Sequence, residues 1–203
     1  LWEFYRAAKH LVPAELAKGT AKKMSRLQSM LDHGDMIRSD APPVRSQRLD
    51  LSEIVEEVVG DAQSKWPSVS FIVSGQPRVS THGTEMSLRI LVGNLVANAA
   101  ESASTRPPME GHSSGQVLVG FGRAENGLRI SVSDNGPGRP EADISGLFYP
   151  FVSSKRVDGG KRVGGGLGLY ICYTIVRQYY SGSITGRKSS KGGLIFDVLI
   201  PDK

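Results

Sequence analysis

The sequence has few of the features that mark secreted, membrane-spanning or metal-binding proteins. It contains a single cysteine, Cys172, so no disulfide can form within the chain, and we expect a reducing compartment, the cytoplasm. No apolar run approaches the length needed to cross a membrane, and no signal peptide is visible. The four histidines lack the spacing of metal ligands. Because the first residue is Leu1 and not Met, we expect a piece of a longer parent protein, which could itself be membrane-associated.

The net charge is +5, but the positions of the basic residues do not suggest a nucleic-acid partner. Four of them fall in one loop ahead of a glycine-rich stretch, where they would meet a polyphosphate: Lys155, Arg156, Lys161 and Arg162. No basic stripe interleaved with aromatic residues, of the kind that binds nucleic acids, occurs elsewhere. We therefore expect a phosphate-bearing ligand and no nucleic acid.

Helix and strand patterns mix without regular alternation from residue 49 onward, which predicts an α+β two-layer sandwich. Helices are expected over 50–65, over 84–101 and from Leu169 onward, where apolar residues recur at helical spacing. Strands are expected over 69–73, 117–121, 128–132 and 194–200, with short strands near Val79 and Ile184. The Asn126-Gly127 pair between two alternating runs predicts a β-hairpin.

Residues 1–48 are expected to form a separate unit, and residues 49–203 the sandwich domain. The first unit would be a partial helical hairpin, with an amphipathic helix over 14–37 and a proline-containing linker over 38–48. The narrow apolar stripe of that helix needs a partner. Two partners stay open, namely a second hairpin in a dimeric four-helix bundle or the chain's own sandwich domain.

A glycine-rich stretch over 163–171 opens the helix that begins near Leu169. Its glycines leave backbone N–H groups bare at the helix N-terminus, where unpaired donors and the helix dipole favour phosphate. Leu167 between the glycines would anchor the loop, while the glycines would let a ligand approach the backbone closely. A flexible loop ahead of a core helix is the alternative for this stretch taken alone.

Three further segments carry groups suited to a nucleotide. Asn94 and Asn98 lie four residues apart on one helix face, and carboxamide oxygens are hard ligands suited to Mg²⁺. Asp134 ends a strand ahead of Gly136 and Gly138, so it would accept a hydrogen bond from an exocyclic amine such as adenine N6. The aromatics of 148–155 would pin a long loop to the core and bring Lys155 to the phosphates. Taken singly, these segments are also compatible with backbone-bonded amides and a hydrophobic anchor, and 134–138 alone favours an ordinary turn.

The four segments, in this order and at these spacings, resemble the motifs of the sensor histidine kinases. That family belongs to the ATPase superfamily shared with gyrase, mismatch-repair and heat-shock chaperone ATPases. The similarity matches 94–101 to the N box, 134–138 to the G1 box, 148–155 to the F box and 164–169 to the G2 box. Gly192-Gly193 through Pro201 is similar to the family's closing strand. The resemblance covers 49–201 and implies the Bergerat-type ATP-binding fold.

The resemblance also implies a role for each matched residue, with ATP and Mg²⁺ as cofactors. Asn98, helped by Asn94, would hold Mg²⁺ on the triphosphate, and Asp134 would read adenine. The implied catalytic residues are Asn94, Asn98 and Lys155. The implied nucleotide-binding residues are Asn98, Asp134, Gly136, Gly138, Phe151, Lys155, Gly164, Gly165, Gly166, Leu167 and Gly168. The loop from about 139 to 163 would be the mobile lid over ATP.

The implied reaction transfers the γ-phosphoryl group of ATP to a histidine, for relay to a response regulator, in a parent protein that is a homodimer. In the hydrolytic relatives a glutamate stands four residues before the magnesium asparagine. Here that position is Asn94, which cannot act as a general base, so transfer is favoured over steady hydrolysis. Glu101, on the same helix, is the fallback candidate for a base.

The phosphoacceptor of the family is not matched. In the family this histidine is followed at once by an acidic residue and, a few residues later, by proline. No histidine here has that context: the four are His10, His33, His82 and His112. Three explanations stay open, namely an acceptor upstream of Leu1, a divergent acceptor at His10, or a kinase that acts on another protein. A module that binds ATP for regulation without transferring it is the second hypothesis for the function.

Overall fold

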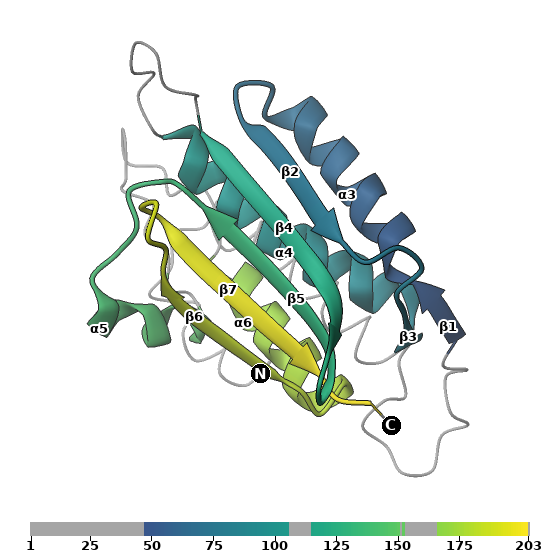
Figure 1. Ribbon diagram of the computed structural model, residues 1–203. Helices are drawn as coiled ribbons and strands as arrows, with labels where there is room; N and C mark the ends of the chain where they lie inside the picture. The colour runs from purple at the N-terminus through teal and green to yellow at the C-terminus, as the bar shows by residue number, and fades with distance from the viewer. Residues whose placement is uncertain (1–46, 106–114, 151, 153–165, 203) are drawn as a thin grey trace, which may run out of the picture.

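The computed structural model describes residues 47–105, 115–150, 152 and 166–202 (Figure 1). Its centre is a five-stranded sheet in the order β2-β4-β5-β7-β6. The strands are β2 (Ser70–Gly75), β4 (Gln116–Ala124), β5 (Gly127–Asp134), β6 (Ser183–Lys188) and β7 (Leu194–Ile200). The β2–β4 pair is parallel, and the other neighbouring strands are antiparallel. This mixed sheet, with its helices, confirms the predicted α+β fold.

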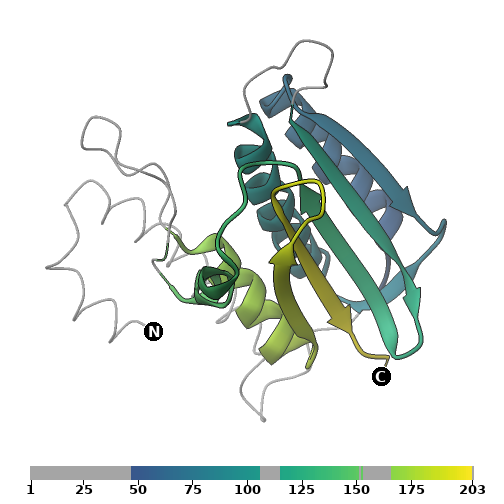
Figure 2. The same cartoon turned by 60° about the vertical axis from the view of Figure 1, so that its left-hand side comes forward.

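Three helices cover one face of the sheet, as the turned view shows (Figure 2). They are α3 (Leu51–Lys65), α4 (Glu85–Ser104) and α6 (Gly168–Thr174), which continues as a π-helical turn, η3 (Ile175–Tyr179). The first two begin after residues whose side chains cap the helix. Asp50 Oδ1 accepts from the backbone N–H of Ser52 at 2.8 Å, and Thr84 Oγ1 accepts from that of Ser87 at 3.2 Å.

The hairpin predicted at Asn126-Gly127 is confirmed. β4 and β5 pair along their whole length, from Val117 opposite Asp134 to Ala124 opposite Gly127. Gly127 has φ +138°, a conformation that side chains rarely adopt. This register matters for the site because it brings the end of β5 beside the start of β4, on the side of the sheet where α4 ends (Figure 1).

A second, two-stranded sheet was not expected. β1 (Gln47–Asp50) pairs antiparallel with β3 (Ser80–Gly83), although residues up to 48 were interpreted as linker. The backbone N–H of Leu51 then donates to the carbonyl of Val79 at 2.8 Å, which ties the start of α3 to this ladder. The strand begins two residues before the predicted domain boundary. The division into 1–48 and 49–203 itself stays a prediction.

Two other boundaries differ from the sequence-based expectation. α4 runs to Ser104 and not to 101, so three more residues are helical than expected. The predicted loop from 139 begins with two short helical turns, α5 (Glu141–Ile144) and η2 (Ser145–Phe148). The helical hairpin predicted over residues 1–37 lies outside the described residues.

The core fills the space between the sheet and the helices, with α4 at its centre. Leu88, Leu91 and Leu95 of α4 are fully buried, and so is Cys172 of α6. The Cys172 thiol donates to the Leu91 carbonyl at 3.6 Å, and burial raises the pKa of this thiol. Cys172 is therefore a small core residue, as expected. No helix within the described ranges is both long and apolar enough to cross a membrane.

Candidate functional site

Asn94 and Asn98 lie half-buried on α4, facing the start of α6. A Cβ built on Gly168 would be 3.0 Å from Asn94 Oδ1 and 3.5 Å from Asn98 Nδ2. The first residue of α6 therefore lies against both amides. Asn94 Nδ2 donates to the Ile90 carbonyl at 2.8 Å, one turn back along α4, which leaves its Oδ1 toward Gly168. The structure thus brings together the predicted N box and the end of the predicted G2 box.

The segment ahead of α6 is described from Gly166 onward. Leu167 is 1% exposed, and its carbonyl accepts the Ile171 N–H at 2.8 Å, so Leu167 is buried at the start of α6. Gly166 has φ +60°, which side chains adopt only with strain. The remaining predicted residues of this region, Phe151, Lys155, Gly164 and Gly165, lie outside the described residues.

Asp134 ends β5 and is 3% exposed. Its Oδ1 accepts two hydrogen bonds of 2.8 Å, one from Ser102 Oγ and one from the backbone N–H of Gly136. Its Oδ2 accepts one of 3.2 Å from the backbone N–H of Leu194, the first residue of β7. Burial raises the pKa of Asp134, and the hydrogen bonds from Ser102, Gly136 and Leu194 oppose that rise. This carboxylate is therefore fixed by α4, by its own turn and by the last strand.

Glycines make room for these contacts. A Cβ on Gly136 would overlap Ser102 Oγ, and a Cβ on Gly193 would overlap both the carbonyl and the carboxylate of Asp134. Gly138 and Gly193 have φ +67° and +70°, and their backbones approach so closely that a Cβ on Gly138 would lie 3.1 Å from the Gly193 carbonyl. The predicted G1 box is thus packed against the turn between β6 and β7.

The aromatic anchor expected over 148–155 is described only in part. Phe148 packs against Phe196 of β7, with ring centroids 5.9 Å apart, and against Tyr173 of α6 at 6.1 Å. Tyr149 is 68% exposed and does not join that contact with the core. Phe148 therefore attaches the end of η2 to both layers of the sandwich, close to the start of α6.

Sequence reasoning missed two partners of Asp134. The helix expected over 84–101 stops one residue short of Ser102, because Ser, Pro and Gly crowd the segment after it. Its position four residues after Asn98, on the same helix face, was the available signal. The sequence does not mark the N–H of Leu194 as a partner, because any residue except proline at that position would supply a backbone N–H.

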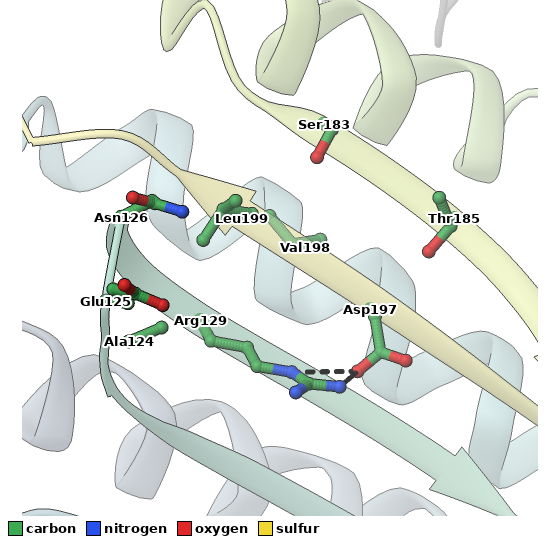
Figure 3. A pocket seen from close by; sticks show the side chains of 9 residues that line it. All are labelled: Ala124, Glu125, Asn126, Arg129, Ser183, Thr185, Asp197, Val198 and Leu199. Atoms are coloured by element: carbon green, nitrogen blue, oxygen red, sulfur yellow. Dashed lines mark hydrogen bonds and ion pairs between the residues drawn. The ribbon is translucent and has the colours of Figure 1, made fainter.

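The opposite face of the sheet bears a separate hollow of about 280 Å³ near the β4–β5 turn (Figure 3). It is lined by residues of that turn and of β5, β6 and β7: Ala124, Glu125, Asn126, Arg129, Ser183, Thr185, Asp197, Val198 and Leu199. Arg129 Nη2 contacts Asp197 Oδ1 at 2.7 Å, and Arg187 Nε contacts Oδ2 at 3.2 Å. No predicted site residue lines this hollow, and two of its charged residues, Arg129 and Asp197, form an ion pair.

Replacing Asp197 by asparagine is expected to cost about 1 kcal/mol of stability at pH 7, because each of the two half-exposed ion pairs contributes about 0.5 kcal/mol. Burial alone would raise the pKa of Asp197, but hydrogen bonds from Arg129 and Ser131 and the attraction of both arginines lower it below its ordinary value. Because its pKa is lowered in the folded state, ionised Asp197 stabilises the fold above about pH 4. This contribution to stability is lost as the pH falls further. In urea unfolding, the difference in free energy of unfolding between the unmodified chain and Asp197→Asn should therefore shrink as the pH falls toward about 2. A constant difference would contradict the ion-pair origin. Asp61→Asn, which makes the same change at an exposed position of α3, is the matched control.

Comparisons with known proteins agree with this geometry. A family model described as "Histidine kinase-, DNA gyrase B-, and HSP90-like ATPase" matches residues 83–203, which include all four motifs. The chain is 28% identical over 172 residues to the C4-dicarboxylate transport sensor protein DctS of Rhodobacter capsulatus, covering 82% of this chain and 24% of that protein. It is 31% identical over 158 residues to the sensor histidine kinase TmoS of Ectopseudomonas mendocina, covering 75% of this chain and 15% of that protein.

Among solved structures, the mycobacterial sensor histidine kinase MprB superposes with a TM-score of 0.64 at 21% identity, covering 77% of this chain and 97% of that chain. This likeness shows the fold. The chain spans a quarter or less of the length of the two curated relatives. Because the family model matches more than half of the chain, the chain belongs to the histidine kinase-, DNA gyrase B- and HSP90-like ATPases, as the ATP-binding region of a sensor histidine kinase.

Proposed function

We propose that this region binds ATP with Mg²⁺ and supplies the γ-phosphoryl group to a histidine, which passes it to a response regulator. The supporting observation is the convergence of three motifs along one face of α4. Asn94 and Asn98 lie against Gly168, and Ser102, one turn beyond Asn98, donates to Asp134. A single helix therefore connects the expected phosphate end of a nucleotide to its expected base end.

The residues at the phosphate end suit a magnesium ion that arrives with its nucleotide. Within the described part of the chain, no group of three or more His, Cys, Asp or Glu residues could hold a metal ion. The candidate ligands are the carboxamide oxygens of Asn94 and Asn98, which are hard but uncharged. Mg²⁺ keeps several waters and takes phosphate oxygens as ligands, so two amides beside a triphosphate fit its preferences. When bound, the ion would neutralise charge on the transferred phosphoryl group.

The described residues would act by binding and positioning. In the transfer, the bond from the γ-phosphorus to the β–γ bridging oxygen breaks, a bond to the imidazole nitrogen forms, and ADP leaves. Asn98 would hold the metal, the N–H groups near Gly168 would face the phosphates, and Asp134 would fix the base. Asn94 cannot take a proton from water, which favours transfer over hydrolysis. The roles proposed for Phe151, Lys155, Gly164 and Gly165 rest on the motif alone.

Replacing Asn98 by alanine is expected to abolish the gain in ATP affinity that Mg²⁺ brings, a loss of about tenfold or more. The reason is that the amide oxygen of Asn98 is one of the two ligands proposed for the ion among the described residues. Calorimetry with ATP, with and without Mg²⁺, measures the gain directly. Asn126→Ala, in the turn by the opposite-face hollow, removes the same side chain and should leave the gain intact. A magnesium effect that survives in Asn98→Ala would contradict the assignment.

The alternative is an ATP-binding module that does not transfer phosphate, or a kinase whose acceptor lies on another protein. The observation that keeps it open is that His10, His33, His82 and His112 all lack the acceptor context. Of these, His82 is exposed on β3, and the other three lie outside the described residues. Incubation of the full-length parent with γ-labelled ATP separates transfer to the parent from both alternatives. Acid-labile label on the parent supports transfer to its own histidine, and bound ATP without such label supports the regulatory module or an acceptor on another protein.

Residues 1–48 are proposed to be part of the dimerisation hairpin and its linker, with the parent protein acting as a homodimer. A cytoplasmic location for this region, whether or not the parent is anchored in a membrane, belongs to the same proposal. Both proposals rest on the motif resemblance and on the amphipathic pattern over 14–37.

A further inference from the structure

Ser102 makes the one side-chain hydrogen bond to Asp134 among the described residues. The other donors, Gly136 and Leu194, use backbone N–H groups. A buried carboxylate needs such donors, because burial without them disfavours its charged form. Since a backbone N–H remains after substitution, Ser102 is the partner whose removal tests the arrangement.

The hydrogen bonds divide the two carboxylate oxygens of Asp134 between protein and ligand. An ionised carboxylate offers about two acceptor positions on each oxygen. Both positions of Oδ1 are taken, by Ser102 Oγ and by the Gly136 N–H, each at 2.8 Å. Oδ2 accepts from the Leu194 N–H alone, at 3.2 Å. The acceptor position left for a ligand therefore lies on Oδ2.

The position of Ser102 along α4 links this carboxylate to the phosphate end of the site. Asn94, Asn98 and Ser102 are spaced i, i+4, i+8, so they follow one face of the helix over about 12 Å. Gly136 has no side chain, and a Cβ there would overlap Ser102 Oγ. The close approach of the β5 turn to α4 therefore depends on this serine–glycine pair. Figure 1 shows the C-terminal end of α4 near the end of β5.

We propose that Ser102 is a positioning residue that determines base specificity: by occupying Oδ1 of Asp134 it directs Oδ2 at the exocyclic amine of a 6-aminopurine. The proposal rests on the proposed ATP-binding function and deepens it. An ionised Oδ2 accepts and cannot donate, so it selects a base that presents an N–H donor at this point. A base with a carbonyl oxygen at this point would place that oxygen against Oδ2, and neither oxygen could donate a hydrogen bond.

The test is a cycle of two changes, one in the protein and one in the ligand. Affinities of the whole chain and of Ser102→Ala are measured by calorimetry for Mg²⁺·ATP and for purine riboside triphosphate, which lacks the 6-amino group. Ser104→Ala is the matched control, because Ser104 lies on the same helix and its hydroxyl donates to the Glu101 carbonyl. Far-ultraviolet circular dichroism and the urea midpoint check that each variant is folded.

Ser102→Ala is expected to bind ATP about tenfold more weakly, and to bind purine riboside triphosphate within twofold of the unmodified chain. Ser104→Ala should match the unmodified chain with both ligands. An equal loss with both nucleotides would show a merely structural role and overturn the proposal, as would unchanged ATP affinity. If Ser102→Ala does not fold, Ser102→Cys, which has a weaker donor of similar size, takes its place in the same cycle. Failure of the unmodified chain to bind either nucleotide would instead overturn the proposed function, and this inference with it.

Discussion

Asp134→Asn is expected to weaken ATP binding by about 100-fold, or close to 3 kcal/mol. Three donors of the protein face the carboxylate of Asp134: Ser102 Oγ–H and the N–H groups of Gly136 and Leu194. An asparagine amide has one oxygen, so at least one donor must face its NH₂ group and stay unpaired, whichever way the amide is turned. At the position of Oδ2, the asparagine presents either its NH₂ group, which cannot accept a hydrogen bond from the base, or an uncharged oxygen, which accepts more weakly. Calorimetry at saturating Mg²⁺ measures the change.

Asp197→Asn is the matched control for Asp134→Asn. It makes the same chemical change on the opposite face of the same sheet, and ATP affinity should stay within twofold of the unmodified chain. The pH dependence gives a second check. Because burial raises the pKa of Asp134, ATP affinity should begin to fall on acidification at a higher pH than an exposed carboxyl would give. Unchanged affinity in Asp134→Asn would remove the basis for assigning base recognition to this residue.

Gly193→Ala is expected to lower the free energy of unfolding by about 3 kcal/mol or more. Gly193 has φ +70°, which costs an alanine about 1 kcal/mol. The added Cβ would also overlap the carbonyl and the carboxylate of Asp134, which cannot move aside because β5 and its hydrogen bonds hold them. Urea unfolding followed by circular dichroism measures the loss, and the ATP site should be disturbed in the fraction that remains folded.

Gly60→Ala controls for the glycine-to-alanine change itself. Gly60 lies exposed within α3, and no atom beyond its own helix lies within 4 Å of a Cβ built there. Alanine should therefore raise stability by about 0.5–1 kcal/mol through helix propensity and reduced freedom of the unfolded chain. A Gly193→Ala variant as stable as the unmodified chain would mean that the turn between β6 and β7 can shift without cost to the fold.

Much of the fold was predictable because its elements carry local signals. The limits of β7 and the end of α3 at Lys65 agree with the structure, since strand alternation and helical spacing are patterns that extend over a few residues. Asn94 and Asn98 also fall on one helix face as predicted. The β1–β3 ladder was not predictable, because two four-residue strands with polar sequences pair over some thirty residues of chain.

The contacts of Asp134 show why half of the site escaped sequence reasoning. Motif spacing identified the carboxylate and Gly136, but its other two partners, Ser102 and Leu194, come from distant parts of the chain that only the fold brings together. The π-helical turn at the end of α6 is another such case. There the Tyr180 N–H bonds to the Ile175 carbonyl, and the buried Tyr180 hydroxyl pairs with Ser87 Oγ of α4 at 2.7 Å, a tertiary contact with no local pattern.

The separation of these partners along the chain couples ligand binding to folding. Asp134 bonds to a residue 32 positions earlier and to one 60 positions later, so its environment is complete only when the C-terminal hairpin has docked on the sheet. Partial opening of β6 and β7 would break the contact between Leu194 and Asp134 and so disrupt the proposed base-binding site, while most of α3 and α4 stays in place. A nucleotide that binds only the closed form stabilises the native state by RT ln(1 + [L]/Kd), about 2.7 kcal/mol at a hundredfold excess over Kd. The cellular nucleotide concentration would then regulate the lifetime of the folded domain as well as its chemistry.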